Sequence, residues 1–537
     1  MQICQKESTW KKESFDLDIN KLSLKTISEN FNSLPELVRV RAAEIGTNLA
    51  FKDDNTEITY EELNQLSDSF AIGLISEGLE FGDRVAIWAP NSINWIVCAI
   101  GIQKAGGILV PINTRMKGNE ASFILNKSEA KFLFTEDSFL GINYIELLEK
   151  EKLNNLNKSF ILNPVSESVQ YKFSDLLNIN SSINLPIIKG EDYADIIFTS
   201  GTTGQPKGVI ITQKQNTQVF KFWSKYVGLN QNDKYLIVNP FFHTFGYKAG
   251  WMSVIIIGCQ GYPEPVFDSE KVLEKIEKFN ISMLPGPPTL YQSILTSKNL
   301  TQDKIQSLRL GVTGAASIPV SLIKDMKEKL GFETVITAYG LTESTGVATM
   351  CTPEDDYETV ASTSGKAIAD VEVKCIDAKG NDVNVGEQGE ILIKGYNVMQ
   401  SYYKDPEATA ETITADGWLK TGDVGILDQN GYLKITDRIK DMFIVGGFNA
   451  YPAEIENIFL NHSSIQQVAI IGVADERMGE VPKAFIVKNK NDDITAEEII
   501  LWAKDNMANY KVPREVVFLD ELPTNASGKI MKYKLRT

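Results

Sequence analysis

Apolar and polar positions alternate along the first half of the chain with the spacing of helices and strands. Residues 59–78 carry apolar side chains at helical spacing after an acidic first turn, and residues 92–106 predict a second, nearly apolar helix. Short apolar runs at 83–90 and 107–113 predict buried strands. Strands and helices that alternate with short connections favour an α/β fold, in which helices cover the faces of a parallel sheet.

The same spacing returns further along the chain and predicts three more strands, at 234–243, 281–288 and 308–316. Residues 149–190 are rich in Asn, Ser and Lys and are weakly periodic, so we expect them to form peripheral cover or a long connection. This part of the chain is therefore expected to contain mixed, mostly parallel sheets with helices.

From residue 371 the pattern changes to short alternating strands with glycine turns, which are typical of a small antiparallel barrel or sheet. A helix, two strands and a second helix follow, and the second helix has Thr495 at its cap and Glu498 three residues later. These last elements predict a compact α+β unit of ordinary domain size. We therefore expect an N-terminal domain over residues 1–437 and a small C-terminal domain over 438–537.

Composition and charge narrow the function classes. The 537 residues are 43% hydrophobic and 23% charged, which is ordinary for a soluble globular protein. Acidic residues outnumber basic ones by 70 to 54, which argues against nucleic acid or an anionic membrane as the main partner. Five scattered cysteines and two histidines do not match a zinc site. With no apolar signal core, and with polar residues interrupting the apolar run 92–112, we expect a cytoplasmic protein without a membrane span. The sequence allows a homodimer and does not decide between a dimer and a monomer.

One loop, TSGTTGQPKG (199–208), combines glycines, hydroxyls and a lysine directly after a predicted buried strand. Glycines let backbone N–H groups approach an anion, hydroxyls add donors, and Lys207 adds positive charge. The Walker pattern fits from neither Gly201 nor Gly204, which excludes a P-loop nucleoside triphosphatase. The alternative is a flexible surface turn, but the hydroxyls and the lysine after a buried strand favour a phosphate site.

Further motifs follow the loop in a fixed order: NPFFHTFG (239–246), GVTGAA (311–316), TAYGLTES (337–344), GWLKTGD (417–423), DRIKD (437–441) and PTNASGKIMKYKLR (523–536). The ordered set resembles the motifs of the adenylate-forming superfamily, which comprises acyl-CoA synthetases, firefly luciferase and the adenylation domains of peptide synthetases. The resemblance extends over nearly the entire chain, from residue 34 to residue 529. It implies an AMP-forming acid–thiol ligase that uses ATP, Mg²⁺ and coenzyme A.

The resemblance also implies roles for individual residues. The residues expected to act in catalysis are Lys529, Glu343, Thr199 and His243, and the Mg²⁺ ligands would be Glu343 and Thr202. The residues expected to bind the nucleotide are Ser200, Gly201, Thr202, Thr203, Gly204, Lys207, Gly314, Ala315, Ala316, Tyr339, Gly340, Thr342, Asp423 and Arg438. Carboxylate oxygens suit both a hard cation and the two ribose hydroxyls.

The implied reaction has two steps. A carboxylate first attacks the α-phosphate of ATP and gives acyl-AMP, with Lys529 bridging the carboxylate and the α-phosphate. The C-terminal domain, mobile in this family, then rotates about Lys440, and Gly446 and Gly447 line the passage through which coenzyme A attacks. The N-terminal domain would thus be the AMP-binding adenylation domain, and the C-terminal domain would carry the catalytic lysine.

Three alternatives bear on this prediction. Luciferase-type oxidation uses a further lysine six residues after Arg438, and Ile444 occupies that position here. Transfer of the acyl group to a carrier protein stays open for a free-standing enzyme, although the eight residues after Lys529 leave no room for an appended carrier domain. A nucleotide-binding regulator without catalysis is disfavoured by the intact Glu343 and Lys529.

The acid is harder to predict. Trp251 and Met252, after His243, indicate an apolar pocket. Lys248 either pairs with a polar group of the substrate or is a solvated helix residue, and the second reading is slightly favoured. The segments FFHTFGYKAGW and MLPGPPTLYQSIL resemble ligases for the bicyclic propanoate left from the steroid C and D rings, and also medium- and long-chain fatty acyl-CoA ligases. We therefore expect a fatty or ring-bearing alkanoic acid as the small-molecule substrate.

Overall fold

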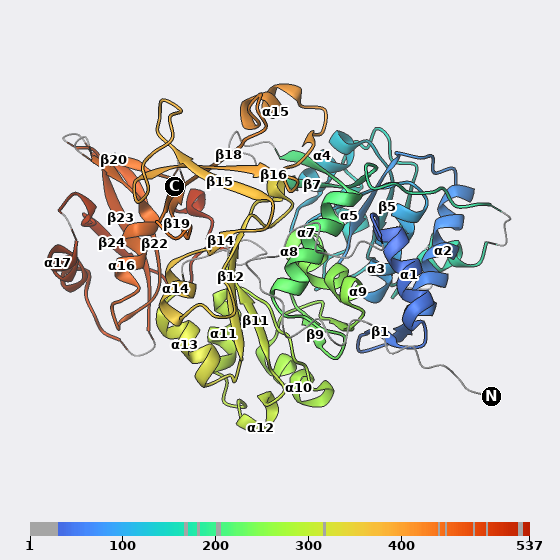
Figure 1. The fold of residues 1–537 in the computed structure, drawn as a ribbon, viewed down its shortest axis with the longest axis horizontal. Coiled ribbons are helices and arrows are strands. Elements are labelled where there is room, and N and C mark those ends of the chain that lie inside the picture. Colours follow the sequence, from blue (N-terminus) through green and yellow to red (C-terminus); the bar gives the residue numbers. More distant parts are fainter. Residues whose placement is uncertain are drawn as a thin grey trace.

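The computed structural model describes residues 31–165, 170–179, 183–199, 206–314, 318–438, 441–445, 448–475, 478–489, 492–507, 509–524 and 530–536. Within these residues the strands form five sheets, and helices pack around them (Figure 1). The predicted α/β class is confirmed. In the described part of the chain no helix is both long enough and apolar enough to cross a bilayer.

A seven-stranded sheet forms the centre of the first half, in the order β17-β8-β7-β4-β3-β5-β6. Its strands are β3 (Arg84–Trp88), β4 (Ile108–Pro111), β5 (Ala130–Thr135), β6 (Lys158–Ile161), β7 (Tyr193–Thr199), β8 (Lys207–Thr212) and β17 (Ser401–Tyr402). The five strands from β6 to β7 run parallel, as the alternating pattern predicted. Strands β8 and β17 add antiparallel pairs at the other edge.

Helices cover this sheet: α1 (Leu34–Ile45), α2 (Tyr60–Ser76), α3 (Ile93–Lys104), α4 (Gly118–Ser128), α5 (Tyr144–Leu148), α6 (Phe173–Leu177) and α7 (Gln213–Tyr226). The capping box of Thr59 and Glu62 starts α2, as its acidic first turn suggested. Of the two alternatives for 149–190, peripheral cover is the one formed, because this segment supplies the edge strand β6 and the helix α6. Helix α6 packs so closely on α2 that a Cβ at Gly73 would lie 2.3 Å from the Leu176 carbonyl oxygen.

Two four-stranded sheets follow, in the orders β2-β1-β10-β9 and β11-β12-β13-β14. The strands are β1 (Leu49–Lys52), β2 (Glu57–Thr59), β9 (Lys234–Ile237), β10 (Gln260–Pro263), β11 (Leu310–Thr313), β12 (Thr334–Tyr339), β13 (Thr349–Met350) and β14 (Lys366–Ala367). The strand predicted at 281–288 is not formed. Only Met283 makes single bridges, to Tyr235 and Leu310. The prolines that follow Met283 lack the N–H group that a strand ladder needs.

The helices of this region are α8 (Thr244–Gly246), the π-helix η3 (Tyr247–Met252), α9 (Ser253–Ile257), α10 (Ser269–Phe279), α11 (Pro288–Leu295), α12 (Gln302–Ile305), α13 (Val320–Glu328), the 3₁₀ helix η4 (Thr342–Ser344) and α14 (Tyr357–Ser362). Helices α8, η3 and α9 follow one another directly in sequence, with a kink at Gly250 inside η3. The chain therefore passes from the end of the NPFFHTFG motif, in α8, into the buried core, where η3 and α9 lie.

The predicted antiparallel sheet after residue 371 is confirmed, with the order β15-β16-β18-β19. Its strands are β15 (Val371–Ile376), β16 (Gln388–Gly395), β18 (Leu419–Leu427) and β19 (Leu433–Arg438), and α15 (Pro406–Thr412) precedes β18. Figure 1 shows this sheet above the centre of the molecule, between the seven-stranded sheet and the C-terminal elements.

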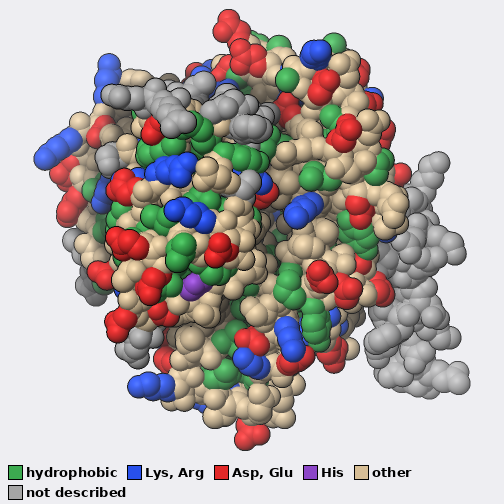
Figure 2. All heavy atoms as spheres, turned by 90° about the vertical axis from the view of Figure 1, so that its left-hand side faces the viewer, with side chains coloured by type: hydrophobic (Ala, Val, Ile, Leu, Met, Phe, Trp, Pro, Cys, Tyr) green, Lys and Arg blue, Asp and Glu red, His purple; other side chains and the backbone are tan. Residues whose placement is uncertain are grey.

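The C-terminal elements form a fifth sheet with helices beside it. They are β20 (Phe443–Val445), β21 (Phe448–Ala450), α16 (Pro452–Phe459), β22 (Ile465–Asp475), β23 (Gly479–Lys488), α17 (Ala496–Asn506), η5 (Asn509–Lys511), β24 (Glu515–Phe518) and η6 (Lys532–Leu535). Two clusters of buried apolar residues, drawn only from these elements and their loops, make up a separate core. On the face viewed in Figure 2, the described Lys and Arg side chains lie among Asp and Glu side chains.

Candidate functional site

The glycine-rich loop connects two strands of a hairpin. Thr199 ends β7, Lys207 begins β8, and the two residues are partners in the antiparallel ladder. Residues Ser200, Gly201, Thr202, Thr203 and Gly204 lie outside the described residues. The hydroxyl of Thr199 and the ammonium of Lys207 therefore stand at the two ends of the loop, where a phosphate group would need them.

Glu343 meets this hairpin from another sheet. It lies in η4, shortly after β12, and its Oε1 accepts hydrogen bonds from Thr199 Oγ1 at 3.2 Å and from the Tyr402 hydroxyl at 3.0 Å. The ring of Tyr402 lies below Lys207, whose Nζ is 5.2 Å from the ring centre. Tyr402 was not among the residues expected from the sequence. The one available signal was an aromatic pair, Tyr402 and Tyr403, one residue before the Asp-Pro start of α15.

The donor set at Glu343 fits Mg²⁺. Among the described residues, none donates a hydrogen bond to Glu343 Oε2, and no three or more His, Cys, Asp or Glu residues are grouped so that they could hold a metal ion by themselves. Mg²⁺ is commonly bound through one or two carboxylates together with substrate phosphates, so a single carboxylate beside a phosphate loop matches its coordination habits.

The motif residues expected near the nucleoside also come together. The Tyr339 hydroxyl donates a hydrogen bond to Asp423 Oδ2 at 2.7 Å, which joins the end of β12 to β18. Arg438 is the strand partner of Asp423 on β19. Gly314 follows β11, the parallel neighbour of β12, and a Cβ there would lie 3.2 Å from the Ala338 carbonyl oxygen. Of the residues expected at the adenine and the ribose, Gly314, Tyr339, Asp423 and Arg438 thus lie on neighbouring strands or at their ends.

Close backbone contact just before η4 explains the glycine at position 340. A Cβ at Gly340 would lie 2.4 Å from the Gly346 carbonyl oxygen, so no other residue fits without movement of the backbone. Thr342 is the first residue of η4 and is half-buried. This turn sets the direction from which Glu343 approaches the hairpin.

His243 begins helix α8, as its context suggested. It is the N-cap residue, its side chain is exposed, and its Nδ1 accepts a hydrogen bond from the Phe245 N–H at 3.2 Å. Asn91, at the end of β3, holds the preceding segment: its Oδ1 accepts from the Phe241 N–H at 2.8 Å, and its Nδ2 donates to the Asn239 carbonyl oxygen at 2.9 Å. Asn91 was not predicted, because its partners are remote in sequence.

The preferred prediction for Lys248, a solvated helix residue, was wrong. Its side chain is completely buried, and Nζ lies 3.0 Å from Oδ1 of Asp195, which is equally buried. The contact is an ion pair without hydrogen-bond geometry. Asn216 Nδ2 donates to the other Asp195 oxygen at 2.6 Å. Burial lowers the pKa of Lys248, and the Asp195 charge opposes that fall. The pair joins η3 to β7, the strand that ends at Thr199.

The remaining predicted site residues cannot be placed, because they lie outside the described residues. They are Ala315, Ala316, Lys440, Gly446, Gly447 and Lys529.

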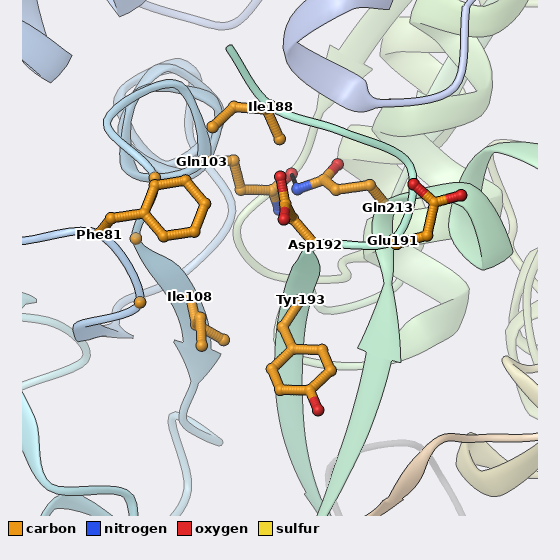
Figure 3. A pocket seen from close by; sticks show the side chains of 11 residues that line it. Phe81, Gln103, Ile108, Ile188, Glu191, Asp192, Tyr193 and Gln213 are labelled. Atoms are coloured by element: carbon orange, nitrogen blue, oxygen red, sulfur yellow. Dashed lines mark hydrogen bonds between the residues drawn. The ribbon is translucent and has the colours of Figure 1, made fainter. Parts of the chain in front are cut away.

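A cavity of about 300 Å³ lies at the opposite end of the seven-stranded sheet (Figure 3). Ile108 and Tyr193, which line it, are the first residues of β4 and β7, whereas Thr199 is the last residue of β7. At the back of the cavity Gln213 Nε2 donates to Gln103 Oε1 at 2.8 Å. None of the motif residues that the structure describes lines this cavity, so it is separate from the region where those residues meet.

Comparison with known proteins decides the family. A family model described as AMP-binding enzyme matches residues 38–403, and a model described as AMP-binding enzyme C-terminal domain matches residues 454–529. The chain belongs to the AMP-binding enzyme family. The superfamily that the ordered motifs suggested is therefore confirmed.

Two related CoA ligases and one solved structure are similar to this chain over most of its length. The chain is 41% identical over 522 residues to the 3-[(3aS,4S,7aS)-7a-methyl-1,5-dioxo-octahydro-1H-inden-4-yl]propanoyl:CoA ligase of Rhodococcus jostii, over 95% of this chain and 99% of the relative. It is 40% identical to the Mycobacterium tuberculosis ligase of the same name, over 94% and 97%. The crystal structure of the anthranilate CoA ligase AuaEII in complex with anthranoyl-AMP is similar, with a TM-score of 0.86, 27% identity and coverage of 96% and 98%.

These relatives are CoA ligases, which confirms the expected enzyme class, an AMP-forming acid–thiol ligase that makes acyl-AMP and then acyl-CoA. A carboxylic acid, ATP and coenzyme A fit this family as substrates.

Proposed function

We propose that this enzyme joins a propanoate that carries an oxidised bicyclic ring system to coenzyme A, with ATP cleaved to AMP and pyrophosphate. The observation that carries the reaction class is the convergence of Thr199, Lys207 and Glu343 from three separate elements at one loop. The two ring-bearing propanoyl:CoA ligases at 41% and 40% identity support the acid.

In the first half-reaction, a carboxylate oxygen of the acid attacks the α-phosphorus of ATP, and the bond between this phosphorus and the pyrophosphate oxygen breaks. The carboxylate is already ionised, so no general base is needed. The protein must instead bring several anions together. Lys207 and the loop hydroxyls offset the phosphate charge, and Lys529 bridges the carboxylate and the α-phosphate. Mg²⁺, held by Glu343 and Thr202, would further neutralise the phosphates.

The nucleoside is held on the other side of the site. Tyr339, Gly314, Ala315, Ala316 and Gly340 surround the adenine in this proposal. Thr342 contacts the α-phosphate, and Asp423 and Arg438 bind the ribose. The hydrogen bond from the Tyr339 hydroxyl to Asp423 supports this assignment, since it orients the carboxylate that would receive the ribose hydroxyls. His243, exposed at the start of α8, lies beside the substrate carboxylate.

In the second half-reaction, the coenzyme A sulfur attacks the acyl carbonyl carbon, the thiol proton is released to water, and the carbon–oxygen bond to AMP breaks. We propose that residues 438–537 act as a mobile domain that turns about Lys440 on residues 1–437, which withdraws Lys529. Gly446 and Gly447 then line the path of the thiol arm. The separate cores on either side of this boundary support such a movement. We further propose the cytoplasm as the compartment, where ATP and coenzyme A are available.

A panel of acids tests this function. The purified enzyme is incubated with ATP, Mg²⁺ and coenzyme A, and AMP release and thioester formation are measured for the bicyclic dioxo-propanoate and for straight-chain acids of medium and long length. We expect the ring-bearing acid to be preferred. Equal turnover of simple fatty acids with none of the ring-bearing propanoate would refute the substrate, and AMP release without thioester would favour a carrier protein as acceptor. Light scattering of the same preparation distinguishes a monomer from a homodimer.

A further inference from the structure

A short segment, residues 399–403, ties the two halves of the phosphate site together, and we call it the strap. The Met399 N–H donates to the Glu343 carbonyl oxygen at 2.8 Å, and the Tyr403 N–H donates to the Gly208 carbonyl oxygen at 2.7 Å. The strap therefore bonds at one end to η4 and at the other to β8. Within the strap, β17 pairs Ser401 with Ile210 and Tyr402 with Val209 of β8. These pairs fix the distance between η4 and the β7–β8 hairpin.

Tyr402 is the strap residue that reaches the carboxylate. Tyr402 is 8% exposed, and its backbone N–H donates to Thr409 Oγ1 at 3.0 Å, which anchors the strap to α15. Its hydroxyl and that of Thr199 both donate to the same oxygen, Oε1 of Glu343, at 3.0 and 3.2 Å. Rotation of the carboxylate would break both bonds, so the two donors determine which carboxylate oxygen they occupy and which one is left for a cation.

We propose that Tyr402 is a positioning residue that holds Glu343 with Oε2 directed to the cation of the adenylation step. This inference rests on the proposed function and concerns the same site. Tyr402 does not touch the cation or the substrate; it acts through Glu343. The carboxylate is thus oriented before ATP arrives, and no bond to Oε1 has to be exchanged when the cation binds.

A phenol suits this task better than a cation or a second carboxylate. The Tyr402 hydroxyl is a neutral group that donates a hydrogen bond to Glu343 Oε1 at 3.0 Å. A neutral donor also leaves the full negative charge of Glu343 available to the cation.

Tyr402→Phe removes only the hydroxyl and is the direct test. The matched control is Tyr403→Phe, which deletes a hydroxyl from the neighbouring residue that makes no hydrogen bond to Glu343. Affinity for Mn²⁺ is measured by electron paramagnetic resonance in the presence of a non-hydrolysable ATP analogue. We expect Tyr402→Phe to weaken Mn²⁺ binding by roughly tenfold, the usual effect of losing a hydrogen bond to a charged group, and Tyr403→Phe to leave it unchanged.

The Mg²⁺ dependence of ATP–pyrophosphate exchange gives a second readout. A positioning role predicts a higher half-saturating Mg²⁺ concentration, with the rate restored at saturation, and an unchanged rate of thioester formation from supplied acyl-AMP. A rate lowered equally at all Mg²⁺ concentrations, or Mn²⁺ affinity within twofold of the wild type, would overturn the proposal. Thermal melts check folding. Should Tyr402→Phe not fold, Thr199→Val, which removes the other donor to Oε1, carries the Mn²⁺ test with the same expectation and the same refutation.

The proposed function and the role of Tyr402 can be refuted independently of each other. If the wild-type enzyme makes no thioester from any acid, the proposed function is wrong, but the Mn²⁺ titration with the ATP analogue still decides the role of Tyr402. If thioester forms and the titration shows no difference between Tyr402→Phe and Tyr403→Phe, the role of Tyr402 is wrong and the function stands.

Discussion

The buried lysine beside the site gives a sharp stability prediction. Lys248→Met removes the ammonium and keeps an unbranched side chain. Lys248 Nζ lies 3.0 Å from Asp195 Oδ1, and both side chains are 0% exposed. At that separation two unit charges attract by about 5 kcal/mol if the effective dielectric constant is about 20.

Most of this attraction is offset in the intact protein, because each buried ion loses several kcal/mol of hydration. Lys248→Met removes the attraction but leaves the Asp195 carboxylate buried, with Asn216 Nδ2 as a donor. Removal of one partner from a buried pair typically lowers the free energy of unfolding by about 3–5 kcal/mol. Lys248→Met combined with Asp195→Asn removes both charges, and we expect a loss of about 1 kcal/mol for the double variant.

Urea denaturation followed by tryptophan fluorescence measures these losses. Trp251 stacks on Tyr247 next to Lys248, so it reports on this region. Lys214→Met is the control, because Lys214 is exposed on α7, and its effect should stay within about 0.5 kcal/mol. A loss below about 1 kcal/mol for Lys248→Met, or a double variant less stable than the single one, would refute the reasoning.

Three further predictions follow. Burial raises the pKa of Glu136 from 4.5 to about 8, with the Asn163 amide opposing, so the folded state holds an extra proton between these values. The stability that this proton gives is complete below pH 4.5 and is lost as the pH rises through about 8, by up to about 5 kcal/mol. Glu136→Gln should abolish that fall in pH-dependent urea melts, and parallel curves for the two proteins would contradict this. Lys529→Ala should slow acyl-AMP formation by about 10²–10³-fold or more and should spare thioester formation from supplied acyl-AMP. Lys534→Ala is the control, and an equal loss in both half-reactions would contradict the bridging role of Lys529. Gly340→Ala should destabilise the protein by about 1–3 kcal/mol in thermal melts, because the new Cβ would lie 2.4 Å from a carbonyl oxygen. Gly314→Ala should destabilise it less, because the corresponding distance is 3.2 Å. A larger loss for Gly314→Ala than for Gly340→Ala would show that the η4 turn can relax.

The sequence predicted well what depends on neighbouring residues. Helix α2 begins at its capping box and α17 at the box of Thr495 and Glu498, because those bonds close within one turn. The alternating β-strand and α-helix pattern predicted the parallel sheet. The prediction of a strand at 281–288 was wrong for a local reason too. Its apolar residues favour a strand, but its prolines lack the N–H groups that a ladder of hydrogen bonds needs.

The ordered motifs determined the family and the reaction class, because each motif is a short stretch whose residue types suit phosphate, a cation or ribose. The tertiary structure decided which side chains meet. Tyr402 reaches Glu343, and Lys248 reaches Asp195, across separations in sequence at which no periodic pattern or spacing carries information. A buried ion pair and a hydrogen bond to a carboxylate both depend on partners within about 3 Å, and only the packing of distant elements sets that distance.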